Sequence, residues 1–126
     1  MKQKFRAWDK FDKVMRDVTL LDYNHNFVGY SYPVFMKSTM HMELMQSTGL
    51  FDRNGQEIFE GDVVRQVRTQ PTTENETITG VVTMIEGAWL IVNDNEQLAS
   101  YLWSETDENE IIGNVYENKE LLEEKE

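Results

Sequence analysis

The sequence predicts a mainly β protein built as a small barrel-like domain. Apolar and polar residues alternate with a period of two through most of the chain, as expected for strands with one buried face. Glycine, asparagine and aspartate separate the alternating segments, and these residues favour the tight turns of hairpins. Segments with a helical period are few, so we expect roughly eight short strands and one short C-terminal helix.

The N-terminal third is expected to begin with a hairpin. Residues 4–9 and 13–21 alternate on either side of a turn. Residues 27–32 form a further strand that ends before Pro33, because proline cannot donate a ladder hydrogen bond. Residues 35–46 fit both a strand and a helix; we favour a strand for the second half and leave the first half open.

The middle of the chain carries the strongest hairpin signal. Asn54-Gly55 lies between short apolar runs, and both residues tolerate the positive φ angles that tight hairpin turns demand. A strand at residues 57–59, a Gly61-Asp62 turn and a strand at residues 63–68 follow. Residues 69–76 contain no aliphatic side chain, so we expect them to form a flexible loop.

Three more strands are expected before the C-terminal segment. Residues 78–86 and 88–93 alternate around Glu86-Gly87, and residues 98–103 follow them. Residues 104–109 are polar and acidic, which indicates a solvated loop.

The C-terminal segment is predicted to hold a last strand and a short helix. The strand covers residues 110–116 and contains Gly113, which indicates a bulge or a close approach of two segments. Asn118 is placed to cap a helix over residues 119–126, with Leu121 and Leu122 as its only apolar anchors.

Length and composition indicate one domain over residues 1–126. The chain has no cysteine, so a disulfide framework, a thiolate metal site and a cysteine nucleophile are excluded. No apolar segment follows the basic N-terminus, and no run approaches the roughly 20 residues of a membrane span. We therefore expect a cytoplasmic protein.

Charge is distributed unevenly along the chain. Residues 1–68 hold ten Lys/Arg and nine Asp/Glu, whereas residues 69–126 hold two and fourteen. An acidic protein repels nucleic acids and anionic membranes as a whole, although a local basic face can still bind them. The asymmetry also permits head-to-tail association between copies.

Three motifs run in order through nearly the whole chain. They are Lys-Phe-Arg-Ala-Trp-Asp at residues 4–9, the double-turn segment at residues 44–63, and Ile-Gly-Asn-Val-Tyr-Glu-Asn at residues 112–118 with Leu121-Leu122. In these motifs the chain resembles the YopX family, small proteins encoded by bacteriophages and prophages. The resemblance implies a mostly-β fold with an SH3-like barrel element, a phage origin and a place in the bacterial host cytoplasm. It carries over no catalytic residue. Lys119 stands where the family often has proline, and Ser47 where it is frequently aromatic.

Few residues have the spacing that catalysis or metal binding requires. Glu60 and Asp62 flank a turn glycine, where the aspartate more often accepts backbone N–H bonds than takes part in acid–base chemistry. His25 and His41 are the only histidines, and nothing in the sequence brings further ligands to either. Phosphate-binding glycine loops and nucleophile-elbow serines do not occur in the sequence. We therefore predict no catalytic residue, no metal and no cofactor, and a protein that is not an enzyme.

Basic and aromatic residues interleave near the N-terminus, as they do in proteins that bind single-stranded nucleic acids. The candidate contact residues for a nucleic acid or another partner are Lys4, Arg6, Trp8, Lys10, Lys13, Arg65 and Arg68. Against nucleic-acid binding, Asp9 and Asp12 interrupt the basic segment, and Trp8 is equally suited to a core.

Our first hypothesis is a non-enzymatic binding or interaction module. Its ligand is an unidentified protein partner or a second copy of the chain, which makes a homo-oligomer. The alternative is a nucleic-acid-binding small β-barrel that uses the basic–aromatic N-terminal segment. No membrane partner is expected.

Overall fold

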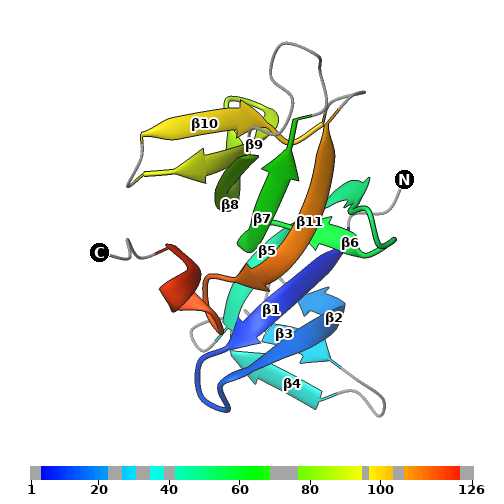
Figure 1. The fold of residues 1–126 in the computed structure, drawn as a ribbon. Helices are drawn as coiled ribbons and strands as arrows, with labels where there is room; N and C mark the ends of the chain where they lie inside the picture. The colour runs from blue at the N-terminus through cyan, green and yellow to red at the C-terminus, as the bar shows by residue number, and fades with distance from the viewer. Residues whose placement is uncertain are drawn as a thin grey trace. The chain divides into compact units, whose positions relative to one another are not determined.

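The computed structural model describes residues 4–22, 27–30, 35–38, 42–68, 77–94, 97–103 and 107–122. This part of the chain holds eleven strands and a single 3₁₀ turn, so the predicted mainly β class is confirmed (Figure 1). The strands are β1 (Phe5–Asp9), β2 (Val14–Asp22), β3 (Phe27–Tyr30), β4 (Phe35–Ser38), β5 (Met42–Phe51), β6 (Glu57–Phe59), β7 (Asp62–Val67), β8 (Thr77–Ile85), β9 (Ala88–Asn93), β10 (Leu98–Tyr101) and β11 (Glu108–Asn114).

The strands form two antiparallel sheets, ordered β4-β3-β2-β1-β5-β6 and β10-β9-β8-β7-β11. The ladders between described strands close neither sheet into a ring. The chain divides into two compact units, Met1–Ser47 (unit 1) and Thr48–Glu126 (unit 2), and β5 crosses the boundary between them. Our prediction of one domain over residues 1–126 stays a prediction.

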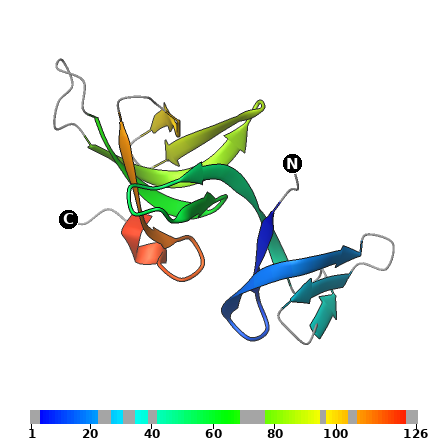
Figure 2. The same ribbon diagram turned by 90° about the vertical axis from the view of Figure 1, so that its right-hand side faces the viewer.

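Unit 1 begins with the predicted β1–β2 hairpin, which Figure 2 shows in blue. β1 also pairs with β5, where Ala7 lies opposite Leu44. Ala7 and Met42 form the buried centre of this unit, and Val18 and Leu44 pack against it. The segment that fitted both a strand and a helix is β-structure in both of its described parts, β4 and the first half of β5.

Unit 2 has its core between the second half of β5, β6 and the five-stranded sheet. The fully buried residues of this core are Ile58, Val64, Val82, Ile91 and Leu102. They come from β6, β7, β8 and β9 and from the residue after β10, so each of these segments contributes one inward-facing aliphatic side chain.

The Asn54-Gly55 hairpin signal is confirmed, with one refinement. Gly55 has a φ of +82° and its amide N–H donates to the Asp52 carbonyl over 2.9 Å, while the Asp52 amide N–H donates to the Gln56 carbonyl over 2.8 Å. Asn54 does not adopt positive φ. The turn therefore places the left-handed conformation on the glycine alone, as in a hairpin with a glycine bulge after the turn.

The predicted irregularity at Gly113 is also confirmed. The register of β11 against β7 shifts between Ile111 and Gly113, which marks a bulge. A Cβ atom at Gly113 would lie 2.6 Å from Oδ1 of Asn118 and 2.7 Å from Cδ1 of Leu121. A larger residue at position 113 would force the Asn118 and Leu121 side chains to shift, so glycine suits this close approach to β11.

Two C-terminal boundaries differ from the prediction. β11 begins at Glu108, so residues 108–109 belong to a strand and not to the acidic loop that we predicted. The short helix is a 3₁₀ turn, η2 (Lys119–Leu122), and the rest of the predicted helix lies outside the described residues. The Asn118 side chain does not cap it; it accepts from the Asn114 amide N–H over 3.2 Å. The predicted flexible loop at residues 69–76 also lies outside the described residues.

Candidate functional site

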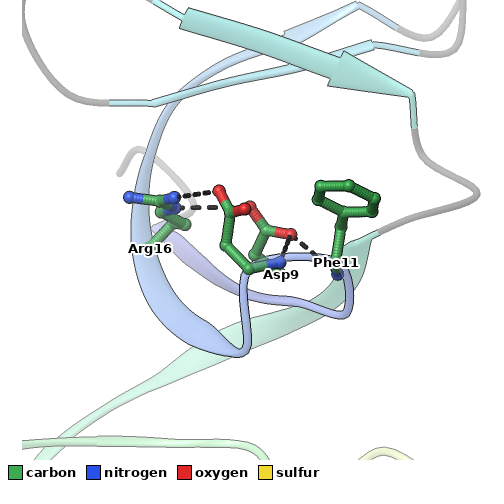
Figure 3. Close-up of polar contacts among 4 residues, drawn as sticks. Asp9, Phe11 and Arg16 are labelled. Atoms are coloured by element: carbon green, nitrogen blue, oxygen red, sulfur yellow. Dashed lines mark hydrogen bonds and ion pairs between the residues drawn. The ribbon is translucent and has the colours of Figure 1, made fainter.

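Buried acidic and amide side chains hold the turns that follow the strands. Asp9, at the end of β1, is fully buried. Its Oδ1 accepts the backbone N–H groups of Phe11 and Asp12, each over 3.0 Å, and its Oδ2 lies 3.4 Å from Nε of Arg16 (Figure 3). This carboxylate is therefore engaged in shaping the β1–β2 turn.

Asp52 has the same role in the second motif. Its Oδ1 accepts the N–H groups of Asn54 and Gln56, each over 2.9 Å, and its Oδ2 accepts the N–H of Ile111 in β11 over 3.1 Å. Burial raises the pKa of this carboxyl, but the three backbone donors and the nearby Arg53 outweigh burial, and the net pKa is lowered from 3.8. The ionised carboxylate thus ties a local turn to a distant strand.

Asp62 and Asn114 complete the pattern. Oδ2 of Asp62 accepts the Phe59 N–H over 2.8 Å, which confirms the predicted turn role of the aspartate after Gly61. Oδ1 of Asn114 accepts the N–H groups of Tyr116 and Glu117 over 3.0 and 2.9 Å. In each of the three motifs, a buried carboxylate or amide side chain therefore holds a turn.

A metal centre has no support in the part of the chain that the structure describes. Within it, no three His, Asp or Glu side chains gather in a way that could hold an ion. His25 and His41 lie outside the described residues.

The candidate contact residues of unit 1 lie on β1 and in the turn after it. Trp8 is buried, with 8% of its surface exposed, so its indole offers little area for stacking on a base. Arg6 is half-buried, and Lys4 and Lys13 are exposed. Nζ of Lys10 lies 3.1 Å from Oε1 of Glu43. The structure thus brings these cations together along one hairpin without an exposed tryptophan among them.

The two candidate contact residues of unit 2 have partners of their own. Arg65 on β7 forms an ion pair with Glu110 on β11. The Arg68 guanidinium donates to the Ser100 hydroxyl over 3.3 Å. Both side chains therefore cross-link neighbouring segments of unit 2.

An apolar cleft in unit 2 was not predicted from the sequence. It has a volume of about 410 Å³, and its lining residues are Leu50, Ala88, Trp89, Tyr101 and Trp103. Tyr101 and Trp103 are 69% and 61% exposed. We call this site the aromatic cleft.

The two exposed aromatic side chains lie on either side of a buried leucine at the end of β10. Leu102 is fully buried in the core of unit 2, and its amide N–H donates to the Trp89 carbonyl over 3.0 Å. Leu102 directly follows β10, and the residues on either side of it, Tyr101 and Trp103, are exposed and so lie away from the core. Trp89 itself packs partly against that core.

A buried polar network fixes the segment that carries Tyr101 and Trp103. The Gln66 side chain is fully buried on β7; its Nε2 donates to the Tyr101 carbonyl and to Oδ1 of Asn109, each over 3.0 Å. Its Oε1 accepts the Ser100 hydroxyl over 2.9 Å. Nδ2 of Asn109 donates to the Leu102 carbonyl over 2.7 Å. The aromatic cleft is therefore preorganised.

The sequence held one signal for this cleft. Residues 98–103 alternate so that Tyr101 and Trp103 share a strand face, while Leu102 lies on the other. Two aromatic residues on the face opposite a buried leucine indicate exposed rings. Their proximity to Trp89 depends on pairing with β9, which alternation alone does not specify.

The fold and these sites define a small, mainly β protein of two antiparallel sheets whose motif residues stabilise turns. A family model described as YopX protein matches residues 4–123, and the chain belongs to this family. The resemblance recognised in the sequence is thereby confirmed.

Two solved structures resemble the chain over its length. Protein EF1440 from Enterococcus faecalis is 29% identical, with a TM-score of 0.65 and coverage of 98% of this chain and 99% of that one. Protein yopX from Bacillus subtilis is 19% identical, with a TM-score of 0.69 and full coverage of both chains. No curated protein matches the chain in sequence. Within the described residues, no helix has the length and apolar character to cross a membrane.

Proposed function

We propose that the chain is a non-enzymatic binding module of a phage or prophage, and that it docks a protein partner in the aromatic cleft. One observation carries the proposal: Tyr101 and Trp103 stand exposed in a concave apolar site of about 410 Å³. Tyrosine and tryptophan dominate the energy of protein interfaces because they bury a large area with few rotatable bonds. The phage origin, and with it a place in the host cytoplasm, rests on the family resemblance.

Preorganisation supports a binding role for this site. The Gln66 side chain forms hydrogen bonds with the Tyr101 carbonyl and the Ser100 hydroxyl. The backbone that carries the exposed tyrosine is therefore fixed before a partner binds. A fixed site loses less conformational entropy on binding than a mobile one.

Charge favours a protein over a nucleic acid as the occupant. Unit 2, which holds the cleft, contains five Lys/Arg and eighteen Asp/Glu, a net charge of −13. Its two candidate contact arginines, Arg65 and Arg68, already have partners within the unit. A nucleic acid would thus meet repulsion at the cleft, whereas a partner with a cationic rim would be attracted.

The non-enzymatic part of the proposal rests on the hydrogen bonds that the motif carboxylates make. Asp9, Asp52 and Asp62 each accept backbone N–H bonds. A carboxylate whose oxygens are occupied by backbone N–H groups is committed to a turn and is not placed to exchange a proton with a substrate.

The test is selection of peptides from a random library on the immobilised protein, followed by affinity measurements with Trp103→Ala and Tyr101→Ala. We expect both variants to weaken binding about tenfold or more. Phe51→Ala is the matched control, because Phe51 is 61% exposed in the same unit and does not line the cleft. Equal binding by the wild type and both cleft variants would overturn the proposal. Retention on single-stranded DNA or RNA that falls steeply with salt would favour the nucleic-acid alternative instead.

A further inference from the structure

The turn between β1 and β2 presents the most exposed large apolar side chain of the described residues. Phe11 is 76% exposed, although phenylalanine belongs among the residues that proteins usually bury. We call residues 10–13 the Phe11 tip.

The Phe11 tip is held in a fixed shape. Oδ1 of the buried Asp9 accepts the N–H groups of Phe11 and Asp12, and the Lys13 N–H donates to the Asp9 carbonyl over 2.7 Å. Lys13 adopts a φ of +60°, a conformation that such local bonds stabilise. Figure 3 shows the Phe11 ring and the Arg16 side chain on opposite sides of Asp9. The ring is thus presented to solvent by a turn that cannot easily fold over it.

The net charge of unit 1, which carries the Phe11 tip, is opposite in sign to that of unit 2, which holds the aromatic cleft. Lys10 and Lys13 flank Phe11, and both are exposed. The charge of Lys10, however, is compensated by Glu43, whose Oε1 lies 3.1 Å from Nζ of the lysine. The one acidic residue of the tip, Asp12, is neutralised by Arg16, whose Nη2 lies 2.7 Å from Oδ2 of Asp12. Unit 1 as a whole holds seven Lys/Arg and five Asp/Glu, against five and eighteen in unit 2.

We propose that the Phe11 tip of one copy of the chain docks in the aromatic cleft of a second copy. The inference rests on the proposed function, because it names the partner of the same cleft. A phenyl ring fits a cleft of about 410 Å³, where Trp89, Tyr101 and Trp103 offer both ring faces and ring edges for the offset and edge-to-face contacts that aromatic pairs prefer. The exposed Lys13 then approaches the acidic unit of the second copy.

The contact is heterologous, since the tip of one copy meets the cleft of the next. Such contacts close into a ring if the rotation between copies allows it. Otherwise they form an open chain with an unoccupied tip at one end and an unoccupied cleft at the other. One aromatic anchor makes a small interface, and we expect a dissociation constant of about 10–100 µM that rises with salt.

Sedimentation velocity from about 10 to 500 µM at low and physiological salt tests the inference. We expect the wild type and Phe51→Ala to associate alike, and Phe11→Ala and Trp103→Ala each to remain monomeric over this range. Phe11 and Trp103 are exposed, so neither variant removes core packing.

Mixing the two monomeric variants gives the decisive measurement. Phe11→Ala retains its cleft and Trp103→Ala retains its Phe11 tip, so an equimolar mixture should form a 1:1 complex and nothing larger. A mixture that stays monomeric, or wild type that stays monomeric at 500 µM, overturns the inference. If the wild type stays monomeric while library peptides still require Trp103, the inference fails and the proposed function stands. If peptides bind regardless of Trp103, the proposed function fails as well.

Discussion

Replacing Asp52 with asparagine should destabilise the protein in a way that depends on pH. The substitution keeps the size of the side chain but exchanges one carboxylate oxygen for an NH₂ group. Oδ2 of Asp52 accepts the Ile111 N–H over 3.1 Å, and Oδ1 accepts the N–H groups of Asn54 and Gln56. In one orientation the asparagine NH₂ group would face the Ile111 N–H, and in the other it would face the N–H groups of Asn54 and Gln56. At least one of the three bonds is lost in either orientation.

The expected loss in free energy of unfolding depends on whether each backbone N–H group can bond to water in place of Asp52. Asn54 and Gln56 are exposed, so water can replace a bond that they lose. Ile111 is half-buried, and its N–H lies in a strand that packs on the unit 2 core. A lost bond to a charged acceptor costs about 1.5–3 kcal/mol, and the easier desolvation of a neutral side chain offsets part of it. We expect Asp52→Asn to lower the free energy of unfolding by about 1–3 kcal/mol at neutral pH.

The pH dependence has a definite sign. The pKa of Asp52 in the folded protein is lowered from its ordinary 3.8, so the ionised carboxylate stabilises the fold above that value, and its contribution is lost as pH falls through the folded pKa. The difference between the wild type and Asp52→Asn should therefore be largest near pH 7 and shrink below about pH 4. Urea denaturation of both proteins across this range measures the difference directly, because the other carboxylates titrate in both. Asp94→Asn, at an exposed site, is the control. A difference below about 0.5 kcal/mol at pH 7, or one that does not shrink in acid, would refute the reasoning.

Three further predictions concern the turns and the loop. Gly55→Val should lower the free energy of unfolding by about 1–3 kcal/mol, because a β-branched residue resists a φ of +82° although nothing lies within 4 Å of the new Cβ; unchanged stability in urea would contradict this. Gly113→Ala should lower it by about the same amount for a different reason, since its Cβ would lie 2.6 Å from Oδ1 of Asn118 and 2.7 Å from Cδ1 of Leu121; a melting temperature equal to that of the wild type would show that the segment moves freely. Limited proteolysis should cut first within residues 69–76, because their polar side chains offer little burial. Early cuts confined to β8 would contradict the prediction that residues 69–76 form a flexible loop.

The features predicted correctly from the sequence are those specified by neighbouring residues. The Asn54-Gly55 turn depends on the positive φ of one glycine and on bonds made by Asp52, at most four positions away. The Gly61-Asp62 turn depends on a bond from the Phe59 N–H to the aspartate. Alternation with a period of two then indicates the strands between such turns.

Features that depend on distant partners were missed. The sequence places Asn109 in an acidic loop, yet it lies in β11, and its side chain accepts a hydrogen bond from Gln66, 43 positions away. Trp8 shares a predicted strand face with Lys4 and Arg6, so the sequence left it open between an exposed basic–aromatic face and a core, and the structure buries it. The aromatic cleft combines Trp89 with Tyr101 and Trp103, and only strand pairing places them together.

The motif residues stabilise turns, whereas the cleft is formed by other residues, and this difference limits what family membership can predict. Asp9, Asp52, Asp62 and Asn114 use their side-chain oxygens to hold backbone N–H groups in turns, so the motifs that identify the family specify its fold. Trp89, Tyr101 and Trp103 lie outside all three motifs. A related chain can therefore keep every turn and present a different surface at the end of β10. The partner of each protein with this fold must then be read from its own exposed side chains, which here are two aromatic rings on an acidic unit.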